Sequence, residues 1–178
     1  MSANRILLLP GWQNSDPDHW QSRWEDLHAD QRVEQDDWLW PRRGDWMAQL
    51  EEAVLADPRP TLLVAHSLGC HLVAAWAAHS QHGARVKGAL LVAPPDPQRE
   101  DFPPQLHNWR KASLALLPFP AIAVLSSDDP FCAHERGQAM AAAWGAEIVE
   151  AGRRGHLNSA SGLGAWPEGR SLLERLAA

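Results

Sequence analysis

The chain has 178 residues, a formal net charge of −6, two cysteines, and ten tryptophans but no tyrosine. This length suits a single domain over residues 1–178, which can bury roughly 70% of its unfolded surface without a disulfide or a metal. Mild acidity without a basic block argues against nucleic acid as a partner, and the two cysteines lack metal-type spacing. The apolar runs are too short for a membrane helix (about 20 residues) or a secretory signal. We therefore expect a cytoplasmic protein that uses neither a membrane nor a metal.

Short apolar runs alternate with helical patterns along the chain. The runs predict strands over residues 5–9, 31–38, 61–65, 86–92, 121–125 and 146–149. Helices are predicted from about residue 16 to 28 and over residues 44–56, 68–79, 133–144 and 167–176. The central runs lack polar alternation, which is typical of strands covered on both faces. The pattern therefore predicts an α/β fold: a mostly parallel six-stranded sheet with helices on both faces, in three layers.

Residues 93–120 interrupt this alternation. The segment contains seven prolines, at positions 94, 95, 97, 103, 104, 118 and 120. A stretch this long and rich in proline predicts a cap or lid loop that crosses over a site. Trp109 lies within the segment, so we expect it to touch a substrate.

The sequence AHSLG at residues 65–69 lies where a buried strand is predicted to turn into a helix of small residues. This is the context of a nucleophile elbow, G-x-S-x-G, whose strained turn exposes the serine hydroxyl. Ala65 stands where that pattern has its first glycine. Ser67 is the candidate nucleophile, and the alternative is that it only caps the helix.

A serine hydroxyl needs a base, and in hydrolases with this elbow the chain order is nucleophile, acid, histidine. His156 follows the last predicted strand, where a base that reaches back to Ser67 should lie. The acid should follow the preceding strand, where Asp128 and Asp129 compete. Pro130 disfavours a helical conformation for the residue before it, which favours Asp129 and leaves Asp128 as the alternative.

An oxyanion hole requires two backbone N–H donors. One should come from Leu68, directly after the candidate nucleophile, and the other from the loop after the first strand, where Trp12 is in place. One such donor can contribute about 3–4 kcal/mol to the stabilisation of the transition state. The Trp12 and Trp109 rings are candidate walls of the substrate pocket.

Together these residues resemble the α/β-hydrolase superfamily and, more narrowly, the small serine hydrolases related to retinoblastoma-binding protein nine and bacterial YdeN. The resemblance spans nearly the whole chain and is carried by LPGWQNS (9–15), HWQSRW (19–24), AHSLG (65–69), SSDDPF (126–131), GHLN (155–158), SGLG (161–164) and WPEG (166–169). It implies a compact α/β-hydrolase with Ser67 as nucleophile, His156 as base and Asp129 as acid. It also implies ester hydrolysis, with peptidase-like activity in some members.

The predicted function is cleavage of ester, or amide, bonds of small-molecule substrates through an acyl-enzyme intermediate, with no cofactor. An acyltransferase that excludes water is left open. A different class of function is a protein-interaction module that uses the same fold, because fold alone does not fix function. Tryptophans gathered on an exposed patch would then form the interface.

Overall fold

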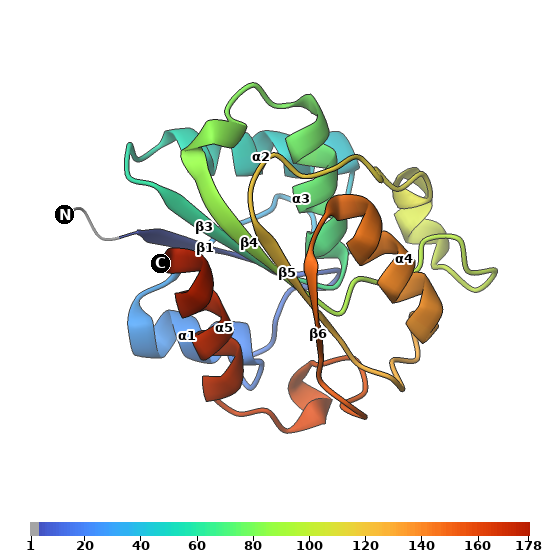
Figure 1. The fold of residues 1–178 in the computed structure, drawn as a ribbon. Coiled ribbons are helices and arrows are strands. Elements are labelled where there is room, and N and C mark those ends of the chain that lie inside the picture. Colours follow the sequence, from blue (N-terminus) through green and yellow to red (C-terminus); the bar gives the residue numbers. More distant parts are fainter. Residues whose placement is uncertain (1–3) are drawn as a thin grey trace.

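The computed structural model describes residues 4–178, and six strands form one sheet at its centre (Figure 1). The sheet has the order β2-β1-β3-β4-β5-β6, and every pairing is parallel. The strands are β1 (Arg5–Leu9), β2 (Gln31–Arg32), β3 (Thr61–His66), β4 (Val86–Val92), β5 (Ala121–Leu125) and β6 (Glu147–Glu150). The predicted fold class, a six-stranded parallel α/β sheet, is confirmed.

Helices cover both faces of the sheet, with α1 and α5 on one side and α2, α3 and α4 on the other (Figure 1). Their bounds are α1 (Trp20–His28), α2 (Arg43–Leu55), α3 (Leu68–His79), α4 (His134–Trp144) and α5 (Pro167–Ala177). Short 3₁₀ helices are η1 (Gly83–Arg85), η2 (Pro104–Trp109) and η3 (Ser159–Ser161). None of the helices in residues 4–178 is long and apolar enough to cross a membrane.

Each central strand supplies two hydrophobic cores, because successive side chains of a strand point to opposite faces. In β3, Leu63 packs in the core beneath α2, α3 and α4, and Val64 packs in the core beneath α1 and α5. The tryptophans Trp46, Trp76, Trp109 and Trp144 fill the first core, and Trp20, Trp24 and Trp166 fill the second. The apolar runs of the sequence thus reflect strands that are buried on both sides.

Two predicted elements near the N-terminus differ from the structure. Helix α1 begins at Trp20 and not near residue 16, because the Asp16 carboxylate accepts a hydrogen bond from the Asp18 N–H and holds a turn there. Leu27, near the end of this helix, is 61% exposed. Strand β2 ends at Arg32 and not at residue 38, because the chain then bends into a turn.

The strand order places a crevice beside β1 and β3. These strands are neighbours, with Leu9 paired to Ala65, although they are not consecutive in the sequence. The chain therefore leaves the sheet in opposite directions on either side of this pair, and ligands of open α/β sheets bind at such a switch point. The loops that follow β1, β3, β5 and β6 all start from this edge.

Candidate active site

Ser67 lies in a strained turn between β3 and α3. Its φ and ψ angles are 55° and −123°, a conformation that L-residues rarely adopt. Gly69 permits the turn, because a Cβ at that position would lie 2.3 Å from the carbonyl oxygen of Leu9. Ala65 stands in place of a glycine, and it is fully buried in the core. The Ser67 side chain makes no capping hydrogen bond to α3.

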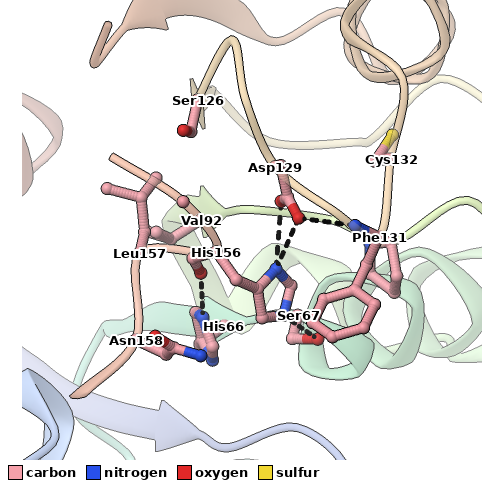
Figure 2. A network of polar contacts seen from close by, with 12 residues as sticks. His66, Ser67, Val92, Ser126, Asp129, Phe131, Cys132, His156, Leu157 and Asn158 are labelled. Atoms are coloured by element: carbon pink, nitrogen blue, oxygen red, sulfur yellow. Dashed lines mark hydrogen bonds and ion pairs between the residues drawn. The ribbon is translucent and has the colours of Figure 1, made fainter. Parts of the chain in front are cut away.

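The three residues that the sequence singles out for chemistry lie in one hydrogen-bonded series (Figure 2). His156 Nε2 lies 2.8 Å from Ser67 Oγ, and His156 Nδ1 lies 3.0 Å from each carboxylate oxygen of Asp129. The Asp129 side chain is 4% exposed and that of His156 is 9% exposed. A carboxylate at Nδ1 requires the proton on that nitrogen, so Nε2 is left to accept from the Ser67 hydroxyl.

Asp128 makes no hydrogen bond to His156. Its carboxylate accepts hydrogen bonds from the Ser126 hydroxyl (3.0 Å) and the Gly155 N–H (2.9 Å). The bond from Gly155 is the main reason that the pKa of Asp128 lies below its usual value. Asp128 therefore fastens the loop that carries His156 to the end of β5, and Asp129 is the carboxylate that meets the imidazole.

The loop after β1 lies directly against the elbow. A Cβ on Gly11 would lie 2.9 Å from Ser67 Cβ and 3.2 Å from Leu68 N. Within residues 4–178, neither the Trp12 nor the Leu68 backbone N–H donates a hydrogen bond to the protein. Both donors expected for an oxyanion hole are thus close to Ser67 in the fold and have no partner within the described chain.

Arg32 holds this loop in place. Its guanidinium donates to Asn14 Oδ1 (2.7 Å), to the Ser15 carbonyl (3.0 Å) and to Ser22 Oγ (2.7 Å). Gln13 and Asn14 have φ angles of 68° and 66°, which other residue types adopt less readily than asparagine. Arg32 could not be singled out from the sequence, because nothing local marks an arginine in a two-residue edge strand.

A cavity of about 930 Å³ opens above Ser67. Its wall includes the apolar side chains of Trp12, Phe102, Leu106 and Phe131. The Phe131 ring stands edge-on to the His156 ring, with centroids 4.7 Å apart. Trp12, a candidate wall of the substrate pocket, thus lies at the cavity.

Trp109, the second candidate wall of the substrate pocket, does not line this cavity. Its side chain is 1% exposed and is absent from the cavity wall. The ring packs edge-on against Trp46 at 5.4 Å, and its Nε1 donates to the Pro41 carbonyl at 2.9 Å. Residues 93–120 therefore reach the cavity through Arg99, Phe102 and Leu106, while Trp109 anchors the segment in the core.

The two thiols of the chain are not placed to act as nucleophiles. Cys70 and Cys132 are free and buried, and desolvation raises the pKa of both thiols, that of Cys132 to about 12. Neither thiol is therefore ionised near neutral pH, as a sulfur nucleophile would need to be. Residues 4–178 contain no cluster of three or more His, Cys, Asp or Glu side chains that could hold a metal ion.

The parallel sheet, with a strained serine turn at the carboxyl end of a central strand, is an α/β-hydrolase fold. The family model described as "Serine hydrolase" matches residues 6–175, and the chain belongs to that family. No curated protein matches the chain.

Solved structures agree with this assignment. A putative YdeN-like hydrolase from Pectobacterium atrosepticum is 30% identical, with a TM-score of 0.84 over 98% of this chain and 89% of the other. The ydeN gene product of B. subtilis is 22% identical, with a TM-score of 0.75 over 98% of both chains. An esterase, RhEst1 from Rhodococcus sp., shares the fold at 15% identity, with a TM-score of 0.70 over 98% of this chain and 91% of the other. The resemblance to YdeN-like serine hydrolases predicted from the sequence is confirmed.

Proposed function

We propose that the protein is an enzyme that cleaves ester bonds of small molecules through an acyl-enzyme intermediate on Ser67. The observation that carries this proposal is the hydrogen-bonded series from Asp129 through His156 to Ser67, with distances of 3.0 and 2.8 Å. The series ends on a strained serine that faces a cavity large enough for a small ester. A serine that served only structure would have no need of a base oriented in this way.

In the proposed reaction His156 takes the proton of Ser67 as Oγ attacks the ester carbonyl carbon. The negative charge that develops on the carbonyl oxygen is stabilised by the backbone N–H groups of Leu68 and Trp12. His156 then gives the proton to the departing alkoxide, which leaves as the alcohol, and Ser67 retains the acyl group. Water, deprotonated by His156, attacks the acyl carbon, and His156 returns the proton to Ser67 Oγ as the bond from Oγ to the acyl carbon breaks and the acid is released. Asp129 holds the Nδ1–H tautomer and stabilises the imidazolium.

The charged side chains around the cavity are already engaged in hydrogen bonds within the protein. The Arg99 guanidinium is paired to both carboxylate oxygens of Asp101, at 2.8 and 2.7 Å. Asp16 accepts hydrogen bonds from Ser159 Oγ at 2.6 Å and from the Asp18 N–H, and these bonds lower its pKa. Because these charged groups already have partners, the apolar wall is left as the main surface for an acyl chain. Amides are the second substrate class, since the same steps apply to them.

We propose residues 93–120 as the cap of this site, because Arg99, Phe102 and Leu106 contribute to the cavity wall. We also propose that the enzyme acts in the cytoplasm. In support, the two cysteines are free and buried, as is usual where the environment keeps thiols reduced. The interaction-module alternative lacks its expected surface, because Trp40 is the one tryptophan among residues 4–178 with a largely exposed side chain.

A fluorophosphonate probe tests the function, because it phosphonylates only a serine that a neighbouring base has activated. We expect the wild-type protein to be labelled and Ser67→Ala to remain unlabelled. A panel of p-nitrophenyl esters of increasing acyl length, read with anilides of the same acids, then defines the acyl group and separates esterase from amidase activity. A folded wild-type protein that does not react with the probe would refute the proposal and favour the interaction module.

A further inference from the structure

Two buried histidines outside the Ser–His–Asp series connect the start of α1 to the backbone of His156. His66 Nε2 lies 2.9 Å from the His156 carbonyl oxygen (Figure 2), and His66 Nδ1 lies 3.3 Å from His19 Nε2. The side chains are almost closed to solvent, with exposed fractions of 3% for His19 and 5% for His66. Buried polar groups that are paired in this way restrict one another's orientation.

The hydrogen bonds determine which nitrogen of each ring carries the proton. His19 Nδ1 accepts from the Gln21 N–H at 3.1 Å, so its proton lies on Nε2 and is donated to His66 Nδ1. His66 consequently carries its proton on Nε2 and donates it to the His156 carbonyl. Burial lowers the pKa of His19 to about 4 and that of His66 well below its ordinary value, so both rings are neutral at pH 7. Each donor therefore faces an acceptor along the series.

His66 and Ser67 are adjacent in the sequence, yet they hold His156 at different points. His66 binds the main-chain carbonyl and Ser67 binds the ring. The next residue, Leu157, has a φ angle of 50°, and its carbonyl accepts from Trp20 Nε1 at 2.9 Å. Strained backbone of this kind persists only where its surroundings hold it. The carbonyl of His156 is therefore fixed by His66, and the carbonyl of Leu157 by Trp20, the first residue of α1.

We propose that His66, oriented by His19, is a positioning residue that keeps the His156 imidazole in line between Ser67 and Asp129. The inference rests on the proposed function, because it assigns His66 a role in the efficiency of that base. In this role His66 acts on the main chain of His156 and not on the substrate. It acts by preventing the His156 loop from relaxing, and a shift of about 1 Å in a reacting group can cost a hundredfold in rate.

Four variants test the proposal against the wild type. His66→Leu removes the donor, and His66→Gln restores an N–H near the same place. His19→Asn keeps an oxygen that can cap α1 but withdraws the bond to His66, because asparagine is a good N-cap with a short side chain. His71→Leu is the matched control: His71 is also buried in this region and donates to a backbone carbonyl, that of Pro95 at 2.7 Å, but not to the His156 loop.

The measurements are the second-order rate of fluorophosphonate labelling, kcat and KM for p-nitrophenyl acetate per titrated active site, and Tm. For His66→Leu we expect the labelling rate and kcat to fall about 10–100-fold, with KM nearly unchanged. His66→Gln should recover to within about threefold of the wild type, and His19→Asn should lose about threefold to tenfold, as expected for one buried hydrogen bond. His71→Leu should lower Tm while its labelling rate stays within about threefold of the wild type.

A purely structural role predicts a different pattern, in which all leucine variants lose Tm and none loses rate per active site. A wild-type rate in His66→Leu would overturn the proposal, as would an equal loss of rate in His66→Gln or in His71→Leu. If His66→Leu does not fold, His19→Asn decides, and an unchanged rate in that variant would overturn the proposal. A wild-type protein that fails to label would refute the proposed function itself, whereas a labelled wild type with an unaffected His66→Leu refutes only the positioning role.

Discussion

Replacing Asp129 by asparagine should disable the base without removing a side chain from the site. Asp129 accepts from His156 Nδ1 with both oxygens, and Oδ1 also accepts from the Phe131 N–H at 2.9 Å. Asparagine has one oxygen for these two donors. If the oxygen stays with Phe131, the amide NH₂ takes the place of Oδ2, 3.0 Å from His156 Nδ1, and this donor favours the imidazole proton on Nε2. In that tautomer Nε2 cannot accept the proton of Ser67.

The size of the loss follows from the tautomer. The opposite amide orientation would place the NH₂ group against the Phe131 N–H. Two donors would then face each other, so this orientation is also unfavourable. A serine hydrolase that is held in the wrong tautomer loses about 10⁴-fold in kcat. At about 1.36 kcal/mol per factor of ten, this corresponds to roughly 5 kcal/mol of transition-state stabilisation. KM should change little, because Asp129 is buried behind His156.

The assay is kcat and KM for a p-nitrophenyl ester, with the fold checked by circular dichroism. Asp128→Asn is the matched control, because Asp128 is the neighbouring carboxylate and binds Ser126 and Gly155 but not His156. Its kcat should stay within about tenfold of the wild type, while its Tm should fall because hydrogen bonds to a charged acceptor are weakened. A folded Asp129→Asn enzyme with nearly full kcat, combined with an inactive Asp128→Asn, would transfer the acid role to Asp128.

Three further predictions concern stability. Between pH 6.5 and about 4 the unfolded chain binds a proton at His19 that the folded protein excludes, so His19 should lower the free energy of unfolding as the pH falls, by about 2 kcal/mol at pH 5. The pKa values of buried His66 and His71 are also lowered and act in the same direction, so His19→Asn should reduce the slope in urea titrations by the His19 share; an unchanged slope would contradict the prediction. Gly69→Ala should lower the free energy of unfolding by about 3 kcal/mol, because the new Cβ would overlap the Leu9 carbonyl. Gly44→Ala is the control: Gly44 has open space around it in α2, so this variant should raise the free energy of unfolding by about 0.5–1 kcal/mol. Trp109→Ala should lower the free energy of unfolding by about 3–5 kcal/mol in urea titrations and leave the acyl-length preference of the folded enzyme unchanged. An altered preference without loss of stability would show that Trp109 contacts the substrate.

The central elements could be predicted from the sequence because burial leaves a local signal. Strands β4 and β5 and helix α3 lie at the predicted residues, since a strand that is covered on both faces is a continuous apolar run. The start of α1 could not be read in this way. Its N-cap is His19, which is outside the set of residues that usually cap helices, whereas Asp16 belongs to that set and is used in a turn.

In the candidate site, too, some residues could be predicted from local sequence and others could not. Ser67, Asp129 and His156 each follow a strand of the same sheet, so chain order and strand ends were sufficient to predict that they lie together. The roles of His66 and Arg32 depend on hydrogen bonds to residues 90 and 17–18 positions away in the chain. No local pattern encodes such distances. The expectation that Trp109 touches a substrate differs from its buried position for a related reason. A proline-rich segment gives no sign in the sequence of which side faces the core.

The tryptophan content has a physical explanation in the irregular segments. Six indole N–H groups donate to backbone carbonyls that lie outside helices and strands, namely those of Leu39, Leu157, Ala165, Asp37, Pro41 and Ser113. Carbonyls in loops lack the partners that a helix or a sheet would supply, and burying them unpaired is costly. Indole combines a large apolar surface with a single donor and no acceptor, so one side chain can fill the core and satisfy such a carbonyl. Tryptophan therefore stabilises loops here as well as the core, and one of these loops carries His156.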